Sequence, residues 1–255
     1  QFLALGQTIT ETYRVTVSDG NSGSSFIDVL VTITGTNDAP VIEVGTSDAL
    51  GAVLEDAASP NLTDSGLINF DDVDLTDGHT ANAVYQGSSY GSQLGDMTAL
   101  VTTSATGPLS GQVTWSYSVL NSLVQFLALG QTITETYRVT VSDGNSGSSF
   151  IDVLVTIKGT NDDPFITSEL LIGSVIEDTD VVSGNLESSG QIQFDDIDLS
   201  DTHSRIISFV SSTHPTTNTQ LGTLNASILT AATGTNAGIL EWTFSIPNNE
   251  VQFLK

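Results

Sequence analysis

The sequence predicts an all-β protein made of tandem β-sandwich domains of immunoglobulin-like architecture, arranged in an elongated array. Short runs alternate apolar and polar side chains, and Gly-, Ser-, Asn- and Asp-rich loops separate them. An internal repeat of about 125 residues supplies roughly seven such runs per copy. No segment shows a convincing helical period, so we expect strands joined by turns.

The repeat divides the chain. Residues 1–33 recur without change as residues 125–157, and residues 66–80 recur with substitutions as residues 190–204, each with an offset of 124. A repeat of this length can bury a core of its own. We therefore expect three parts, which are the closing hairpin of a preceding repeat (1–38), a complete sandwich (39–160) and the N-terminal part of a following repeat without its closing hairpin (161–255).

Alternating apolar residues locate the strands of the complete repeat. In chain order they are predicted at 41–44, 67–70, 83–85, 99–102, 113–119, 133–141 and 151–157. The last two flank the loop DGNSGSS and predict a β-hairpin. Trp115 and Trp242 each lie in an alternating run, which favours a place in the core over an exposed platform for sugars.

The charge balance excludes several classes of protein. The chain has 30 acidic and 5 basic residues, for a net charge of −25, so it lacks the Lys and Arg clusters that bind nucleic acid. It has no cysteine, which excludes disulfides, thiol catalysis and Cys-ligated metals. No run of apolar residues approaches the length of a transmembrane helix, so we expect no membrane insertion.

Catalytic motifs are also missing. The sequence contains no G-x-S-x-G, H-E-x-x-H or phosphate-binding loop. Paired carboxylates for glycoside hydrolysis are available in any acidic chain, but an active site is not normally copied along an array. His79 and His203 each follow an aspartate by two residues, and we expect them to fix a loop by hydrogen bonds rather than to bind zinc. The protein is therefore predicted to be non-enzymatic.

Acidic residues gather at places that recur from repeat to repeat. Asp72 and Asp74 are two residues apart, so on an extended strand they share one side, and Asp77 can join them after the bend. Oxygen ligands at this spacing suit Ca²⁺, and carboxylates this dense repel each other without a cation. A solvated acidic loop is the alternative. The candidate metal ligands are Asp19, Asn37, Asp38, Glu55, Asp56, Asp72, Asp74, Asp77, Asp143, Asn161, Asp162, Glu177, Asp178, Asp196, Asp198 and Asp201.

Two segments resemble a known family. The run VTVSDGNSGSSFIDVLVTITGTNDAPVI resembles the closing hairpin and linker of the VCBS and cadherin-like repeats of giant bacterial RTX-type surface adhesins, and FDDVDLTDGHT resembles their early acidic motif. The resemblance covers essentially the whole chain. It implies a secreted or cell-surface protein whose sandwich modules act as extenders, stiffened by Ca²⁺ at or near the junctions.

Cadherins place an Asn-Asp pair in the linker, an Asp-x-Asp in the following domain and an Asp-x-Gly late in that domain. By this resemblance, two sets of residues would each meet at one junction, namely Asn37 and Asp38 with Asp72, Asp74 and Asp143, and Asn161 and Asp162 with Asp196 and Asp198. Glu55 and Glu177 resemble the early glutamate that reaches the next junction. Cadherin linkers carry an acid where this chain has Gly35 or Gly159, which predicts fewer ions per junction.

We therefore expect a non-enzymatic structural extender of a large extracellular adhesin or fibre, made rigid by Ca²⁺. The alternative is a carbohydrate-binding sandwich, whose glycan platform would lie in the variable loops 86–98 and 211–223, near Tyr85 and Tyr90.

Neighbouring copies are the expected partners. Residues 1–34 of one copy would complete residues 165–255 of the next, head to tail, because an isolated hairpin and an open sheet edge are both unfavourable. The hairpin residues expected to become buried against Phe194, Trp242 and Phe244 are Ile9, Tyr13, Val15, Val17, Ile27, Val29, Val31 and Ile33. Asp19 would then lie near Asn161 and Asp162.

Overall fold

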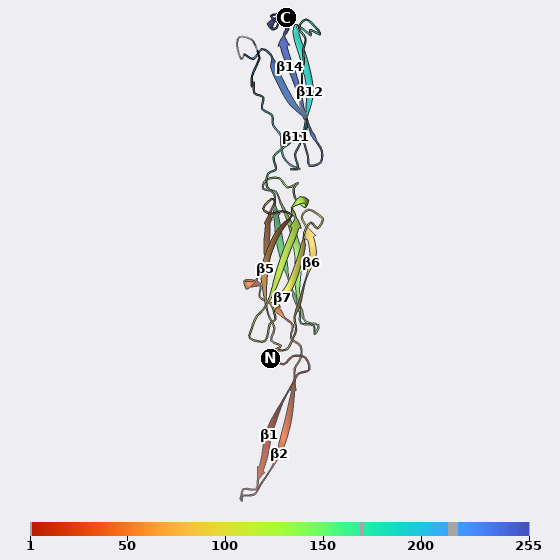
Figure 1. Cartoon of the computed structure of the whole chain (residues 1–255). Helices are drawn as coiled ribbons and strands as arrows, with labels where there is room; N and C mark the ends of the chain where they lie inside the picture. Colours follow the sequence, from red (N-terminus) through yellow and green to blue (C-terminus); the bar gives the residue numbers. More distant parts are fainter. Residues whose placement is uncertain (1, 169–170, 214–218, 255) are drawn as a thin grey trace. The chain divides into compact units, whose positions relative to one another are not determined.

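A computed structural model describes residues 2–168, 171–213 and 219–254 (Figure 1). The described residues form strands and three short 3-10 helices, which confirms the predicted all-β class. The chain divides into two compact units. The first unit comprises Gln1–Leu123 and Thr132–Lys158, and the second comprises Val124–Gln131 and Gly159–Lys255.

The first unit contains a sandwich of two four-stranded sheets, ordered β4-β10-β9-β6 and β3-β5-β8-β7. Only the pairing of β4 with β10 is parallel. The strands are β3 (Val41–Ile42), β4 (Leu50–Leu54), β5 (Asn61–Asp71), β6 (Thr80–Ser88), β7 (Asp96–Thr103), β8 (Gly111–Leu120), β9 (Thr132–Ser142) and β10 (Ser148–Lys158), with 3-10 helices η1 (Val44–Thr46) and η2 (Asn121–Leu123).

Trp115 lies at the centre of the sandwich, fully buried, as the alternation of its strand predicts. Its indole Nε1 donates a hydrogen bond to the carbonyl of Asp48 at 2.7 Å. Gly66 and Gly51 face the ring from the two sheets, because a Cβ at either position would lie 2.6 Å or 3.0 Å from it. Small residues are therefore required at these positions. They also explain why the sequence pattern missed β4, whose inward-facing Gly51 removes the apolar alternation.

A buried carboxylate joins the two sheets of the sandwich. Glu135 on β9 is fully buried and accepts hydrogen bonds from the amides of Leu94 (2.6 Å) and Gly95 (3.2 Å). It also accepts a hydrogen bond from the hydroxyl of Tyr117 on β8 (2.7 Å). The hydroxyl of Tyr137 on β9 shares its single proton between Glu135 (3.1 Å) and the carbonyl of Gly95 (2.5 Å). Burial, together with this carboxylate, raises the pKa of both phenols. Four donors satisfy a charge that would otherwise be costly to bury.

Residues 8–34 form a sheet of their own, β1 (Thr8–Ser18) paired with β2 (Ser24–Thr34), drawn in red tones in Figure 1. We call it the N-terminal hairpin. Its register matches that of β9 and β10, because Thr8 pairs with Thr34 as Thr132 pairs with Lys158. The hairpin is thus set by local sequence, and it forms no part of the two sheets of the sandwich.

The second unit has one four-stranded sheet, ordered β11-β12-β14-β13. Its elements are β11 (Phe165–Ile166), β12 (Asn185–Asp195), β13 (Thr223–Thr230), β14 (Gly238–Pro247) and the 3-10 helix η3 (Asn248–Glu250). This sheet corresponds to β3-β5-β8-β7 of the first unit. The counterparts of β4 and β6, residues 172–176 and 204–212, are described but form no strand. In the first unit β4 and β6 pair with β10 and β9, and the described part of the second unit has no such pair.

Candidate metal centre

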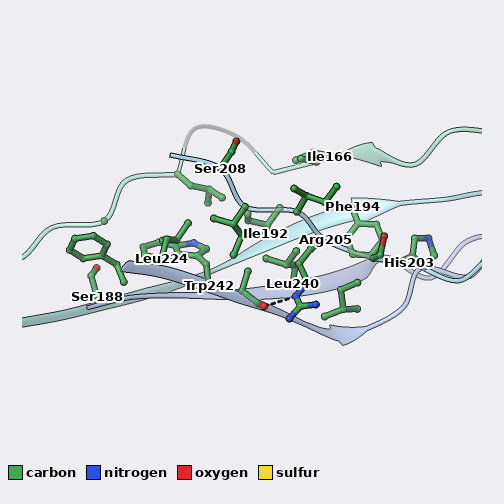
Figure 2. A pocket seen from close by; sticks show the side chains of 18 of the residues that line it. Ile166, Ser188, Ile192, Phe194, His203, Arg205, Ser208, Leu224, Leu240 and Trp242 are labelled. Carbon is green, nitrogen blue, oxygen red and sulfur yellow. Dashed lines mark hydrogen bonds between the residues drawn. The ribbon is translucent and has the colours of Figure 1, made fainter. Parts of the chain in front are cut away.

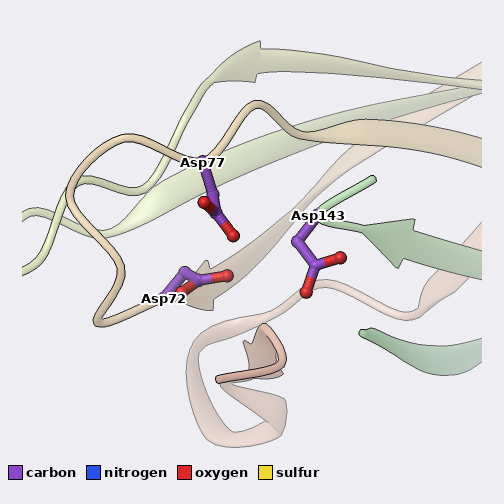
Figure 3. A group of neighbouring side chains, drawn as sticks. All are labelled: Asp72, Asp77 and Asp143. Atoms are coloured by element: carbon purple, nitrogen blue, oxygen red, sulfur yellow. The ribbon is translucent and has the colours of Figure 1, made fainter. Parts of the chain in front are cut away.

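Three carboxylates converge at one end of the sandwich (Figure 3). Asp72 follows β5, Asp77 lies in the bend before β6, and Asp143 follows β9, so the antiparallel topology brings them to the same end. One carboxylate oxygen from each lies within 4.8 Å of the other two. Their relative exposures are 2%, 9% and 3%. Three largely buried carboxylates at this separation repel one another unless a cation or protons neutralise them.

Asp74 extends this cluster toward the linker. Its amide donates to Asp72 Oδ1 at 3.0 Å, and its own Oδ2 accepts a hydrogen bond from the amide of Asp38 at 2.9 Å. Burial raises the pKa of Asp74, and the charges of Asp77, Asp38 and Asp72 raise it further. Its Oδ1 is buried and accepts no hydrogen bond among the described residues.

Asp143 is held in a tight turn. Its Oδ1 accepts the amides of Asn145 (2.7 Å) and Gly147 (3.0 Å), and its Oδ2 accepts from the Asn37 side chain at 2.9 Å. Burial opposes ionisation, but these hydrogen bonds outweigh it and lower the pKa of Asp143. Asn37 Oδ1 is buried without a hydrogen-bond donor among the described residues. The cluster therefore contains a carboxyl group of lowered pKa, on Asp143, together with two buried oxygens, on Asp74 and Asn37, that accept no hydrogen bond from the described residues.

Two further side chains support the cluster. His79 Nε2 lies 3.1 Å from Asp72 Oδ2, and its ring tilts against Phe70 with centroids 4.9 Å apart. This confirms the expectation that the histidine fixes the loop by a hydrogen bond. Asn145 Nδ2 donates to Asp77 Oδ2 at 3.1 Å. Asn145 is not among the ligands predicted from the sequence, although it is two residues after Asp143 in the repeated SDGN.

The second unit repeats part of this arrangement. The amide of Asp198 donates to Asp196 Oδ1 at 3.0 Å, and the amide of Asp162 donates to Asp198 Oδ2 at 3.0 Å. His203 Nε2 lies 3.0 Å from Asp196 Oδ2. Asp201, the counterpart of Asp77, is half-buried. No described residue of this unit occupies the position of Asp143.

The linkers differ, as the substitution of Asp163 for Ala39 leads us to expect. Asn161 Nδ2 donates to Asp163 Oδ1 at 3.3 Å, whereas its counterpart Asn37 donates to Asp143.

The N-terminal hairpin carries a carboxylate in the geometry of Asp143. Asp19 Oδ1 accepts the amides of Asn21 at 2.8 Å and Gly23 at 2.9 Å. These backbone hydrogen bonds lower the pKa of Asp19, which is exposed. The identical turn therefore forms with or without a surrounding sandwich.

The predicted ligands in VLED (53–56) and in its counterpart VIED (175–178) lie away from this cluster. Asp56 and Asn121 exchange two hydrogen bonds, of 2.9 Å and 2.7 Å, at the Asn61 end of β5, whereas Asp72 follows its Asp71 end. An 11-residue strand separates the two ends by about 36 Å.

Asp178 and Asn248 repeat this clasp at 3.0 Å and 2.7 Å, and both aspartates adopt a left-handed φ, of 59° and 57°. The Asp-Asn clasp therefore closes a turn in each unit. Glu55 is buried, and its amide donates to the carbonyl of Lys158 at the end of β10, while Glu177 is half-buried.

The donor set of the first unit fits a hard cation. It consists of carboxylate and amide oxygens, without thiol or thioether groups, and such ligands suit Ca²⁺ better than zinc or copper. Asp72, Asp74, Asp77, Asp143 and Asn37 could hold it.

A different candidate site is an apolar groove on the open face of the second unit, of about 840 Å³ (Figure 2). Ile192, Phe194, Leu224, Leu240 and Trp242 line it from the sheet. The segments 171–175 and 203–208, which form no strands, border it. Among the described residues of the second unit, no strand covers this face of the sheet.

No family model and no curated protein matches this chain. Several solved cadherin ectodomain fragments are similar to it at low identity. Mouse protocadherin-24 EC1-3 is 12% identical with a TM-score of 0.36, over 93% of this chain and 66% of that one. Protocadherin Gamma C5 EC1-3 is 14% identical with a TM-score of 0.38, over 93% and 66%. Mouse clustered PcdhgC3 EC1-3 is 14% identical with a TM-score of 0.39, over 95% and 66%. This chain thus spans just under two thirds of those chains.

None of the helices in the described residues has the length and apolarity to cross a membrane.

Proposed function

We propose that this chain is a non-enzymatic structural module of a large extracellular adhesin or fibre, in which Ca²⁺ makes the repeats rigid. The observation that carries the proposal is the buried cluster of Asp72, Asp77 and Asp143. The proposed repeat boundaries are 1–38, 39–160 and 161–255, with one complete sandwich over 39–160. Secretion and membership in an RTX-type adhesin belong to this proposal and rest on the resemblance of the linker and acidic motifs.

The cation would act by tying the linker to the sandwich. Asn37 and Asp38 already contact Asp143 and Asp74 through single hydrogen bonds. A divalent cation bound by these oxygens would add ligand bonds between the linker and two loops, and it would neutralise the repulsion among them. The proposed role is mechanical and involves no chemical step.

Calorimetric titration of Ca²⁺ into the chelator-treated full chain tests this role. We expect saturable binding with a Kd on the order of 10⁻⁴ M, as for other extracellular calcium modules. Asp72→Asn combined with Asp143→Asn should remove the tightest binding. Asp152→Asn is the matched control, because Asp152 pairs with Arg138 on the outer face of β9 and β10. Failure of the wild-type chain to bind Ca²⁺ would contradict the proposal.

Head-to-tail assembly of copies is the second part of the proposal. The same sequence is buried as β9–β10 and exposed as the N-terminal hairpin. Tyr137 and Val141 are 2% and 0% exposed, whereas the identical Tyr13 and Val17 are 54% and 71% exposed. Exposing these apolar side chains to water is unfavourable, and a contiguous apolar face of this kind is typical of an interaction surface.

The groove of the second unit is the complementary surface. In the first unit, β9 and β10 lie between β4 and β6 and cover the face that contains Trp115. The second unit has the corresponding sheet with Trp242, and the counterparts of β4 and β6 border the groove without pairing. The hairpin of a second copy would supply two central strands that the described part of the second unit does not contain, and it would bring Asp19 to Asp196 and Asp198. This contact does not close on itself, so it would build a filament.

Disulfide trapping tests the register of this assembly in a chain without cysteine. In the first unit Thr140 pairs with Asn82, so the proposal pairs Thr16 of one copy with Ile206 of another. Antiparallel partners lie about 4.5–5.5 Å apart at Cα, within the span of a disulfide. Mixing a Thr16→Cys chain with an Ile206→Cys chain should give a cross-linked heterodimer.

The control for this trap replaces Ile206→Cys with Val210→Cys, four residues further along. Ile206 and Val210 are similarly exposed, at 95% and 85%, so random collisions would link both equally. Equal yields from the two mixtures would contradict the proposed register.

A carbohydrate-binding sandwich is the alternative function. The groove volume falls within the range of roughly 300–1,000 Å³ typical of small-molecule sites. The predicted platform is weakly supported, because Tyr85 packs edge-on against Tyr137 at 5.7 Å while Tyr90 is exposed. Residues 214–218 of the second loop lie outside the described residues. Binding of the full chain on a glycan array would favour this alternative.

A further inference from the structure

The turn before β7 contains the receptor for the buried carboxylate of the first unit. In Gln93–Gly95 the amides of Leu94 and Gly95 both point to Glu135, at 2.6 Å and 3.2 Å. The Gln93 side chain holds the turn by donating to the carbonyl of Gly95 at 2.8 Å. The hydroxyl of Tyr137 donates to the same carbonyl at 2.5 Å. The turn thus binds one carboxylate and one phenol from a single strand.

The second unit contains the same turn, Gln220–Gly222, before β13. Gln220 Nε2 donates to the carbonyl of Gly222 at 2.9 Å, which matches the first unit. Gly222 is buried like Gly95, and a Cβ there would lie 2.2 Å from the ring of Phe244, as one at Gly95 would lie 2.3 Å from the hydroxyl of Tyr117. Among the described residues, nothing accepts a hydrogen bond from the amides of Leu221 and Gly222. The second unit therefore contains the receptor turn, and none of the described residues places a carboxylate on it.

The N-terminal hairpin carries that carboxylate. Glu11 occupies the position of Glu135 in the identical sequence, and it pairs with Val31 as Glu135 pairs with Val155. It is exposed, and Tyr13, the counterpart of Tyr137, already donates its hydroxyl to it. The side chains of Glu11 and Tyr13 thus project from the same face of the hairpin, two residues apart, as Glu135 and Tyr137 do on β9.

We propose that Glu11 of one copy binds the Gln220–Gly222 turn of a second copy and locks the register of the assembly. Its carboxylate accepts the amides of Leu221 and Gly222, and Tyr13 donates to the carbonyl of Gly222. This inference rests on the proposed head-to-tail complementation and names the polar contact that specifies it.

The lock selects a register because an unmatched carboxylate is costly to bury. Sliding the hairpin by one residue exchanges its two faces, and sliding it by two places Glu11 against the apolar groove instead of the amides. A buried carboxylate without donors is strongly unfavourable. The apolar residues of the hairpin supply attraction in several registers, whereas Glu11 is satisfied in one.

The second unit also offers one donor fewer. Phe244 stands where the first unit has Tyr117, whose hydroxyl donates to Glu135 at 2.7 Å. Glu11 would therefore accept from the two amides and share the single hydroxyl proton of Tyr13 with the carbonyl of Gly222. Phe244→Tyr would restore the fourth donor in a site that the first unit shows can hold it.

Sedimentation velocity of the full chain tests the lock through the association constant. We expect Glu11→Gln to weaken association about tenfold or more, since a hydrogen bond to a charged group is lost and an amide NH₂ faces the backbone amides. Phe244→Tyr should strengthen it about threefold to tenfold. Asp28→Asn, which removes the same charge from the outer face where Asp28 pairs with Arg14, should leave it unchanged.

The outcomes distinguish the head-to-tail complementation from the Glu11 lock. A wild-type chain that does not associate would overturn the complementation itself. A wild-type chain that associates, with Glu11→Gln equal to Asp28→Asn, would overturn the lock and leave the complementation standing. Glu11 is exposed in the single chain, so the thermal melt of the Glu11→Gln monomer should match the wild type and exclude a folding defect.

Discussion

Millimolar Ca²⁺ is expected to raise the melting temperature of the chelator-treated chain. A ligand that binds only the folded state stabilises it by RT ln(1 + [L]/Kd), or about 2.7 kcal/mol at a hundredfold excess over Kd. In a unit of this size that corresponds to an upward shift of roughly 5–10 °C. The physical reason is that Asp72, Asp77 and Asp143 are held within 4.8 Å of each other in the fold and are far apart in the unfolded chain. Differential scanning calorimetry with Ca²⁺ and with EGTA measures the shift.

Combined Asp72→Ala and Asp74→Ala substitutions should abolish most of this difference. Both side chains are buried, so the melting temperature without Ca²⁺ will change as well, and the informative quantity is the Ca²⁺-dependent shift. Asp152→Ala keeps the cluster intact and should retain the full shift. Melting temperatures that agree with and without Ca²⁺ in the wild-type chain would contradict calcium binding at this cluster.

The two units should differ in this response. The second unit holds Asp196 and Asp198 in the same contacts as the first, but none of its described residues supplies the carboxylate of Asp143. Fewer charged ligands weaken a calcium site. The transition of the second unit should therefore shift less, and the proposed association with another copy would increase the shift by adding Asp19.

Local sequence accounts for the features that could be predicted. The hairpin at 133–157 follows from alternation around a Gly-rich loop, and the contact of His79 with Asp72 spans seven residues. The convergence of Asp72, Asp77 and Asp143 does not follow from local sequence. Their two loops are 66 residues apart and meet only because β5, β6 and β9 share one end of the sandwich. The repeated motif indicated the cluster, and the topology determined its geometry.

Other features depend on distant contacts that a single sequence does not reveal. Glu135 reads as a polar position in an alternating strand, yet it is fully buried because donors from three segments meet there. Asp56 reads as a metal ligand, yet it forms a clasp with Asn121, 65 residues away. Asp178 and Asn248 recur together in the second repeat, which indicates a shared role. The sequence alone does not show that the two residues are hydrogen-bonded to each other.

The same substitution at equivalent positions of the two identical segments should affect different properties, namely folding stability in one segment and association in the other. Val139→Asp places a carboxylate at a fully buried site between the sheets, and we expect it to lower the free energy of unfolding of the first unit by about 4 kcal/mol or more. Val15→Asp makes the same change in the same local sequence, but Val15 is 49% exposed in the N-terminal hairpin. The single chain should then lose no more than about 0.5 kcal/mol. Denaturant titration of the two variants measures both quantities.

Val15→Asp should instead abolish association between copies, because Val15 of the hairpin would take the place of Val139 against the groove of another copy. Phe26→Asp makes a matched apolar-to-acid change on the outer face, at a position whose counterpart Phe150 is 55% exposed and pairs only with β9, and it should leave association intact. Sedimentation velocity of the three chains separates the cases. If Val15→Asp unfolds the single chain as Val139→Asp does, the hairpin packs within its own molecule. If it associates as the wild type does, another surface joins the copies. Loss of association with an unchanged unfolding transition would show that one sequence serves as core in one repeat and as interface in the other.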